Sequence, residues 1–260
     1  MPNTLKDLTF LLPVRIDSPE RLANLMTVVR FYEKQTESEF IVLEADDSPK
    51  AMAVTEIGER IRYEFIRDDD QVFHHTHLNN TLLKMARTPC AALWDADAIA
   101  PLDQIRGAMS LIKEKGHTMA YPYGGMYWNV GETFSEIFRQ RLDIRMLTDF
   151  PQSRYLLCGY HSVGGAVLVD LAGYAACGGD NENIKGWGPE DAERFKRLEI
   201  LGLTPARTDG SLYHLHHPRG LNSGDFRTEV AMATKKEYCR ICAMDKEKLL
   251  EEIKKWSWKI

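Results

Sequence analysis

The sequence of 260 residues lacks any apolar run long enough to span a bilayer, and it has no large excess of either charge. Its 33 basic and 38 acidic residues give a formal charge of -5, which argues against the dense Lys/Arg patches that bind nucleic-acid backbones. The apolar run 8–14 is short, contains Pro13 and is followed by Arg15, unlike a signal peptide. We therefore expect a cytoplasmic protein without a nucleic-acid partner, and leave open a peripheral position at the inner face of a membrane.

Cysteine is also scarce. The five cysteines are an odd number spread along the chain, which is not the pattern of a small disulfide-stabilised secreted protein. Cys239 and Cys242 form one C-x-x-C pair, and without a second pair it does not support a zinc site. There is no Gly-rich phosphate loop and no G-x-S-x-G, so kinases, dehydrogenases and serine hydrolases lose their usual support.

Strand and helix patterns alternate in the first half, which predicts an α/β fold with a mostly parallel sheet flanked by helices. The apolar runs 8–14, 40–45 and 90–94 predict strands that are buried on both faces. We expect helices that begin after Ser18, near His77 and at Pro101, the first with Ser18 as its N-cap.

The second half is less regular. Residues 121–131, YPYGGMYWNVG, predict a loop near a binding cleft, although aromatic residues flanking the core would give the same pattern. Residues 164–170 predict another strand, and a helix is expected from Pro189. From Glu229 the chain predicts an amphipathic helical extension, packed on the domain or forming a homodimer. We thus divide the chain into a domain at 1–228 and a C-terminal extension at 229–260.

Two acidic side chains, Asp95 and Asp97, follow the apolar strand 90–94. The carboxyl ends of strands face the ligand crevice in such sheets, and carboxylates at i and i+2 can share a divalent cation such as Mg²⁺ or Mn²⁺. The alternative is a turn at the end of the strand in which an Asp caps the next helix.

A histidine cluster lies in the segment YHLHHPR. Alternate residues of an extended segment point the same way, so His214 and His216 can bind one ion together, and imidazole shifts the preference toward Mn²⁺. Whether His217 takes the place of His216 is left open. A polar surface loop with clustered histidines is the alternative.

The segment GWGPED combines an aromatic side chain with two acids. Pro189 starts a helix and places Glu190 and Asp191 in its first turn, where the helix dipole alone favours acidic residues. The functional interpretation is a carboxylate beside a sugar-stacking Trp187 that accepts a proton from a hydroxyl group.

Three further residues follow predicted strands. Asp46 and Asp47 come after the second strand, where an acid often meets a ribose or a base, and a role in forming a turn explains them equally well. Arg15 ends the first strand and can face a nucleotide. His74, His75 and His77 are interpreted as surface or capping residues.

Taken together, these residues resemble a nucleotide-sugar glycosyltransferase of the GT-A fold, near the β-1,4-galactosyltransferase branch and its bacterial relatives. The likeness runs from Leu8 to Asn222. It rests on LLPVR, LWDADAIAP, the block 161–202 with GGAVLV and GWGPED, and YHLHHPRG, in that order, with HLNNTLLKMA ahead of the second segment. The resemblance implies a Rossmann-like fold with a mixed, mostly parallel sheet flanked by helices.

Residue roles follow from the resemblance at the matched positions. It implies Asp97, His214 and His216 as ligands of Mn²⁺, or of Mg²⁺ in its place. It implies Asp191 as the general base and Glu190 as the acid that orients the acceptor. It also implies substrate contacts for Trp187, Arg15 and Asp95, the last supporting the ribose or the water shell of the metal. Gly164, Gly165, Asp46 and Asp47 are further candidates for substrate binding.

The expected function is metal-dependent transfer of a sugar, with inversion, from a UDP-sugar to a hydroxyl of a glycan or lipid-linked sugar acceptor. One alternative is a metal-dependent phosphoesterase or nucleotide-sugar hydrolase, which needs no acceptor. The other is a non-catalytic sugar-binding module on a transferase fold. The sequence identifies neither the donor sugar nor the acceptor.

Overall fold

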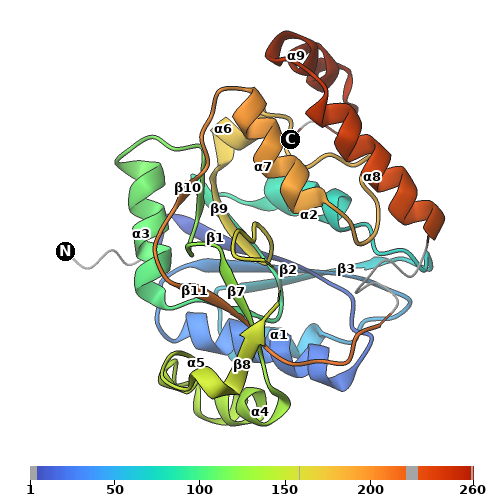
Figure 1. Cartoon of the computed structure of the whole chain (residues 1–260). Helices are drawn as coiled ribbons and strands as arrows, with labels where there is room; N and C mark the ends of the chain where they lie inside the picture. Colours follow the sequence, from blue (N-terminus) through green and yellow to red (C-terminus); the bar gives the residue numbers. More distant parts are fainter. Residues whose placement is uncertain (1–4, 158, 221–227, 259) are drawn as a thin grey trace.

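The structure is a computed structural model, and it describes residues 5–157, 159–220, 228–258 and 260. Asn222, the predicted end of the resemblance, lies outside these residues. Two sheets make up the framework, with helices on both sides (Figure 1). No helix in the described part of the chain is both long and apolar enough to cross a membrane. Its cysteines, Cys90, Cys177, Cys239 and Cys242, are free.

The larger sheet has seven strands in the order β10-β6-β9-β4-β1-β2-β3. Its pairs are parallel except those that β9 makes with β4 and β6, so the sheet is mixed and mostly parallel, as predicted. Its strands are β1 (Leu8–Val14), β2 (Glu39–Asp46), β3 (Ile61–Arg67), β4 (Cys90–Trp94), β6 (Met119–Tyr121), β9 (Ala166–Asp170) and β10 (Ala206–Arg207).

A second, smaller sheet has the order β5-β11-β7-β8. Its strands are β5 (Ala98–Ile99), β7 (Met126–Val130), β8 (Arg154–Leu156) and β11 (Ser211–His214). The segment 121–131, predicted to be a loop, thus contains strand β7, whose Tyr127 is buried. The reason is pairing with β11, which lies far along the chain and leaves no local signal.

Helices cover both faces of the large sheet. α1 and α2, which precede the smaller sheet in the sequence, lie on opposite sides of it (Figure 1). Ser18 caps α1 as predicted, since its side chain accepts a hydrogen bond from the amide of Arg21. The helices of the chain are α1 (Pro19–Glu33), η1 (Met52–Ile57), α2 (His75–Met85), α3 (Leu102–Lys113), α4 (Glu132–Arg141), α5 (Arg145–Thr148), η2 (Pro151–Ser153), α6 (Leu171–Ala176), α7 (Glu190–Ile200), α8 (Thr228–Cys242) and α9 (Lys246–Lys255).

An aromatic cluster formed by side chains of β1, β2, β4 and α1 fixes the segment that follows β4. Phe10 stacks between Tyr32 and Phe40, and Trp94 meets Phe10 and Tyr32 edge-on. Such aromatic pairs contribute about 0.5–1.5 kcal/mol each beyond the area they bury. The Tyr32 hydroxyl donates to the carbonyl of Ala100 at 3.1 Å and accepts from its amide at 2.8 Å. The core thereby holds the chain just after the Asp95–Asp97 turn in one place.

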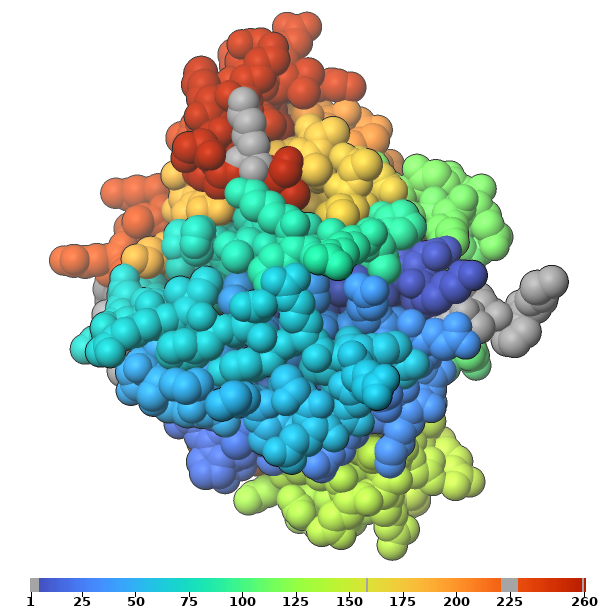
Figure 2. Space-filling view, turned by 180° about the vertical axis from the view of Figure 1, so that it is seen from behind, coloured from blue at the N-terminus to red at the C-terminus, as the bar shows by residue number. Residues whose placement is uncertain are grey.

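The C-terminal extension consists of two helices, α8 and α9, where one amphipathic helix was expected. It rises at one end of the molecule, and the chain between 50 and 90 covers the back (Figure 2). α8 packs on α7, and the buried ring of Trp256 lies over the guanidinium of Arg197, 5.4 Å from centroid to Cζ. The extension thus packs on the rest of this chain. A homodimer through it remains a prediction.

Candidate functional site

A cavity of about 750 Å³ opens at the carboxyl ends of β1 and β4. This is where open α/β sheets bind ligands, and the size suits a small molecule. Most of the sequence-predicted residues line it, namely Arg15, Asp95, Asp97, Gly164, Gly165, Trp187, Glu190, Asp191 and His214. Asp46, Asp47 and His216 are not among its lining residues.

The β5–β11 pairing brings the acidic turn and the histidine segment together. His214 lies opposite Ala98 in this antiparallel pair, and the amide of Leu215 donates to the carbonyl of Asp97 at 2.8 Å. The turn itself is fixed because the amide of Asp95 donates to the carbonyl of Gly165 at 2.9 Å. The backbone ladder, rather than the side chains, therefore sets the spacing between Asp97 and the histidines.

Asp97, His214 and His217 each offer one ligand atom, and these three atoms lie within 4.8 Å of one another. Nε2 of His217 is 3.2 Å from Asp97 Oδ2, and Nε2 of His214 is 3.6 Å from Asp97 Oδ1. Asp97 is buried, and its Oδ1 has no hydrogen-bond partner among the described residues. A carboxylate with two imidazoles is a donor set that suits Mn²⁺ or another transition metal.

The tautomer of a neutral His217 ring follows from the contact that Nδ1 makes. Nδ1 lies 2.7 Å from the carbonyl oxygen of Pro218, which can only accept, so Nδ1 carries the proton. In the neutral ring Nε2 then has a lone pair, which faces a carboxylate oxygen of Asp97. Two lone pairs that face each other repel, and a cation between them removes the repulsion. An outer hydrogen bond of this kind is the usual support of a metal-bound histidine.

The geometry favours His217 over His216, the choice that the sequence left open. β11 ends at His214, so the alternation of an extended strand does not continue to His216. The amide of His216 donates to Ser135 Oγ at 2.9 Å, and its carbonyl accepts from Arg139 Nη2 at 2.8 Å. Turning of the chain after the strand thus places His217, and not His216, beside Asp97.

Burial and neighbouring charges shift the pKa values of His214 and of the two acids in the turn. Burial lowers the pKa of His214 to about 4, against the opposing effect of Asp97, so the ring is neutral at pH 7 as a metal ligand requires. Burial opposes the charge on Asp97, but the neighbouring His214, His217 and Arg21 outweigh it and lower the pKa of this carboxyl. Burial and the charge of Asp97 raise the pKa of Asp95 to about 7. The two acids of the turn therefore differ, because Asp97 ionises more readily than Asp95.

Asp191 and Glu190 stand in the first turn of α7, as predicted. Asp191 is partly exposed, and its Oδ1 accepts a hydrogen bond from Arg194 Nη1 at 2.6 Å. Burial raises the pKa of Glu190, and its Oε2 is buried without a hydrogen-bond partner in the described part of the chain. Trp187, between Gly186 and Gly188, also lines the cavity. Its side chain is 48% exposed and can stack on a sugar ring.

His75 is a cavity residue that the sequence analysis missed. It is the first residue of α2, and its Nδ1 lies 3.8 Å from Glu190 Oε1. Burial opposes its protonation, but Glu190, Asp95 and Asp191 outweigh it and raise the pKa of His75 to about 9. The sequence offered no acidic neighbour near His75, because all three acids come from distant segments.

Two glycines leave room for the site. A Cβ on Gly164 would lie 2.8 Å from Asp191 Oδ2, and one on Gly165 (φ +82°) would lie 2.6 Å from the ring of Tyr127. Tyr123 donates its hydroxyl hydrogen to the carbonyl of Gly164 at 2.6 Å and fixes this approach. Tyr127, also missed by the sequence, lines the cavity beside His214, with ring centroids 5.9 Å apart.

Arg15 and Asp46 have structural partners. Arg15 lines the cavity, but its guanidinium donates to Asp68 Oδ2 at 2.6 Å and to the carbonyls of Ala45 and Asp70. Asp46 accepts from the amide of Ile16 at 3.0 Å and pairs with Lys50 at 2.8 Å. These contacts fit the turn-forming alternative for Asp46 and hold the loops after β1, β2 and β3 together.

Residues 145–218 match a family model described as the N-terminal domain of galactosyltransferase. The match includes Asp191, His214 and His217. A search of curated proteins gives no significant match.

Among solved structures, a mannosyltransferase from Pyrobaculum calidifontis in complex with GDP-Man and Mn²⁺ has a TM-score of 0.54 at 14% identity, over 82% of this chain and 58% of its own. Glucosyl-3-phosphoglycerate synthase from Mycobacterium tuberculosis, with Mn²⁺, UDP-glucose and phosphoglyceric acid, has a TM-score of 0.54 at 12% identity, over 89% and 79%. A Drosophila β1,4-galactosyltransferase 7 variant, with manganese, UDP-Gal and xylobiose, has 0.50 at 17%, over 87% and 79%.

At these identities the structural likeness shows the fold, and it is the predicted GT-A fold. This chain spans 58% of the length of the mannosyltransferase. Together with the family match, the shared fold confirms the predicted resemblance to GT-A glycosyltransferases and agrees with the predicted enzyme class.

Proposed function

We propose that the chain is a metal-dependent inverting glycosyltransferase that moves a sugar from a UDP-sugar to a hydroxyl group of a glycan acceptor. The observation that carries this proposal is one cavity lined both by the ligand group Asp97, His214 and His217 and by the carboxylate of Asp191. The family match at 145–218 supports it, as do the structural neighbours solved with Mn²⁺ and nucleotide sugars.

Asp97, His214 and His217 would hold the metal. Asp97 Oδ1, which has no hydrogen-bond partner among the described residues, and the Nδ1–Pro218 hydrogen bond of His217, which leaves Nε2 as the donor atom of a neutral ring, fit that role. A bound Mn²⁺ supplies Lewis acidity, which neutralises the leaving diphosphate. Arg21 and Arg219 line the same part of the cavity and add positive charge for the phosphates. Inversion follows from attack on the anomeric carbon from the face opposite the diphosphate.

On the acceptor side, Asp191 accepts the proton of the attacking hydroxyl, and Glu190 orients the acceptor. Trp187 offers an exposed ring for stacking on a sugar. A phosphoesterase with two metals is less well supported, because the described residues contain one group of three ligands and not two such groups. The acceptor side would also have no role in simple hydrolysis.

The test is the variant Asp191→Asn, assayed for transfer from a panel of UDP-sugars to glycan acceptors with Mn²⁺. Removing a general base costs about 10²- to 10⁴-fold in turnover. Donor affinity, measured by calorimetry, should stay within about twofold because the group bound to the donor is unchanged. Glu199→Gln, an exposed acid at the far end of α7, is the matched control with wild-type turnover. Wild-type turnover of Asp191→Asn would rule out the assignment of the base.

A further inference from the structure

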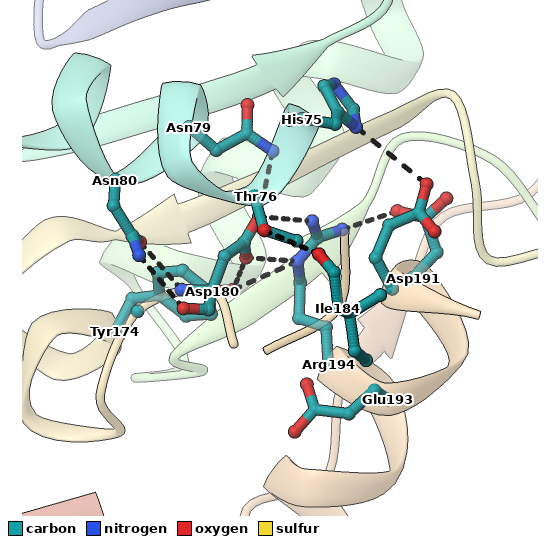
Figure 3. A network of polar contacts seen from close by, with 12 residues as sticks. His75, Thr76, Asn79, Asn80, Tyr174, Asp180, Ile184, Asp191, Glu193 and Arg194 are labelled. Carbon is teal, nitrogen blue, oxygen red and sulfur yellow. Dashed lines mark hydrogen bonds and ion pairs between the residues drawn. The ribbon is translucent and has the colours of Figure 1, made fainter. Parts of the chain in front are cut away.

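Arg194 lies between two carboxylates of different exposure. It is one turn after Asp191 on α7, and its side chain is only 3% exposed. Nη1 donates to Asp191 Oδ1 at 2.6 Å, while Nη2 and Nε donate to Asp180 Oδ2 and Oδ1 at 2.9 Å each (Figure 3). One guanidinium therefore joins the residue in the cavity to an acid in the interior.

Asp180 is fixed from two helices. Asn79 Nδ2, from α2, donates to its Oδ2 at 2.8 Å, and the hydroxyl of Tyr174, from α6, makes a close contact with its Oδ1. The side chain of Asn80 closes the set, since Nδ2 donates to the carbonyl of Asp180 at 2.9 Å and Oδ1 accepts from its amide at 2.8 Å (Figure 3). Both the backbone and the carboxylate of Asp180 are held.

The two carboxylates are not equivalent. The side chain of Asp180 is 2% exposed and that of Asp191 is 29% exposed. Burial opposes the charge of Asp180, but Arg194 outweighs it and lowers the pKa of this carboxyl, so the buried pair is ionised. Because the planar guanidinium makes two hydrogen bonds to the fixed Asp180, Arg194 has one orientation, and Asp191 must adapt to it.

The held oxygen of Asp191 is Oδ1, and the other, Oδ2, lies beside Gly164, which also lines the cavity. A Cβ placed on Gly164 would lie 2.8 Å from Oδ2, which shows how closely this oxygen approaches the cavity wall at Gly164. Pairing at i and i+3 on a helix is common at protein surfaces and is weak there. Here the burial of Arg194 and its second carboxylate partner make the pairing rigid.

We propose that Arg194 is a positioning residue for Asp191. Buried Asp180, held by Asn79 and Tyr174, fixes the orientation of the Arg194 guanidinium. This inference rests on the proposed role of Asp191 as the base. The carboxylate is thereby aimed at the acceptor hydroxyl before any substrate is bound. α2, which carries the two asparagines of the HLNNTLLKMA segment, thus contributes to catalysis through Asn79 and Asn80 without reaching the acceptor.

A double-mutant cycle tests the proposal. Arg194→Lys keeps a cation but cannot hydrogen-bond to both carboxylates in a fixed plane. We expect kcat to fall about 10- to 100-fold, because a displacement near 1 Å in a reacting group costs up to 10²-fold. The KM for the acceptor and the calorimetric donor affinity should stay near wild type. In the Asp191→Asn background, Arg194→Lys should cause no further fall in the residual turnover.

Arg197→Lys is the matched control. Arg197 is also buried on α7, but it pairs with Glu193 at 3.0 Å and with the carbonyls of Cys177 and Gly179, and it does not contact Asp191. The variant Arg197→Lys should lower the melting temperature by about as much as Arg194→Lys does, and its kcat should stay near wild type. Asn79→Ala, which removes one donor to Asp180 and keeps the ion pair, should give a smaller loss of the same kind as Arg194→Lys.

Two results would overturn the proposal: wild-type kcat in Arg194→Lys, or the same fold loss of turnover in the Asp191→Asn background as in the wild type. The second result would mean that Arg194 acts on the fold and not through Asp191. Failure of the proposed function gives a different pattern, in which Asp191→Asn alone keeps wild-type turnover.

Discussion

At the scale of single residues, His217 and His216 show how one position changes the chemistry of a site. The ring of His217 is buried beside Asp97, and its proton is held at Nδ1 by the carbonyl of Pro218. The contacts of His216 with Asn24, Ser135 and Arg139 go through its backbone and not its ring. Only one of these adjacent histidines is therefore ready to bind a cation.

We predict that Asp97→Ala and His217→Ala remove the Mn²⁺ dependence of UDP-sugar binding, whereas His216→Ala leaves it intact. Loss of a ligand from a three-residue site leaves the cation too weakly held to bridge to a diphosphate. Calorimetry of the donor with and without Mn²⁺ measures the effect. The assignment of ligands is wrong if His216→Ala has the larger effect.

His75 predicts a pH dependence of stability. Its pKa is about 9 in the folded chain, against 6.5 for the free side chain, because Glu190, Asp95 and Asp191 surround it. Its stabilisation is therefore complete below pH 6.5 and is lost as the pH rises through 9. The shift corresponds to about 3 kcal/mol.

The check is the free energy of unfolding of the wild type and of His75→Gln in urea at pH 6 and at pH 9.5. We expect the difference between the two proteins to be larger at pH 6. An equal difference at both pH values would show that folding does not raise the pKa of His75.

At the scale of elements, the sequence predicted what local pattern determines. The apolar runs 8–14 and 90–94 match β1 and β4 to the residue, because strands buried on both faces are apolar throughout. β3 was missed although Ile61–Arg67 largely alternates apolar and charged side chains, the local pattern of a partly exposed strand at the edge of a sheet. β7 was taken for a loop because only its pairing with distant β11 makes it a strand.

The same distinction applies to the site. The acids at the end of β4 and at the start of α7 could be predicted because strand ends and helix starts are local features. His75, Tyr127 and Arg194 could not, because their roles depend on partners brought close by the fold. The choice of His217 depends on where β11 ends, which no residue near it signals.

Gly165 directly precedes β9 of the large sheet and lines the cavity. We predict a large loss of folding stability for Gly165→Ala. Its φ is +82°, and the added Cβ would lie 2.6 Å from Tyr127, beside His214. Gly116→Ala is the matched control, with φ +73° and nothing within 4 Å of the added carbon. The control should cost about 1 kcal/mol of stability from backbone strain alone.

The extra loss at Gly165 should be about 1–3 kcal/mol, as is typical of overpacking in a dense interior. Urea denaturation of both variants measures the difference, and Mn²⁺-dependent donor binding should weaken in Gly165→Ala only. Equal losses of stability in the two variants would show that Tyr127 moves aside without cost.

At the scale of the whole molecule, the proposed catalytic site draws on segments from most of the chain. Asp97 follows β4 of the large sheet, His214 ends β11 of the small sheet, and Asp191 begins α7. The β5–β11 pairing and the Arg194–Asp180 pair hold these parts in register across one cavity. α8 packs on α7, and neither α8 nor α9 contributes a residue to the lining of the cavity.

The most direct measurement is the anomeric configuration of the product, followed by NMR while the protein transfers sugar from an α-linked UDP-sugar to a glycan acceptor. We expect a β-linked product that forms only with a divalent cation such as Mn²⁺ and an acceptor, and about 10²- to 10⁴-fold more slowly in Asp191→Asn. An α-linked product, or free sugar released at the same rate without any acceptor, would contradict this expectation.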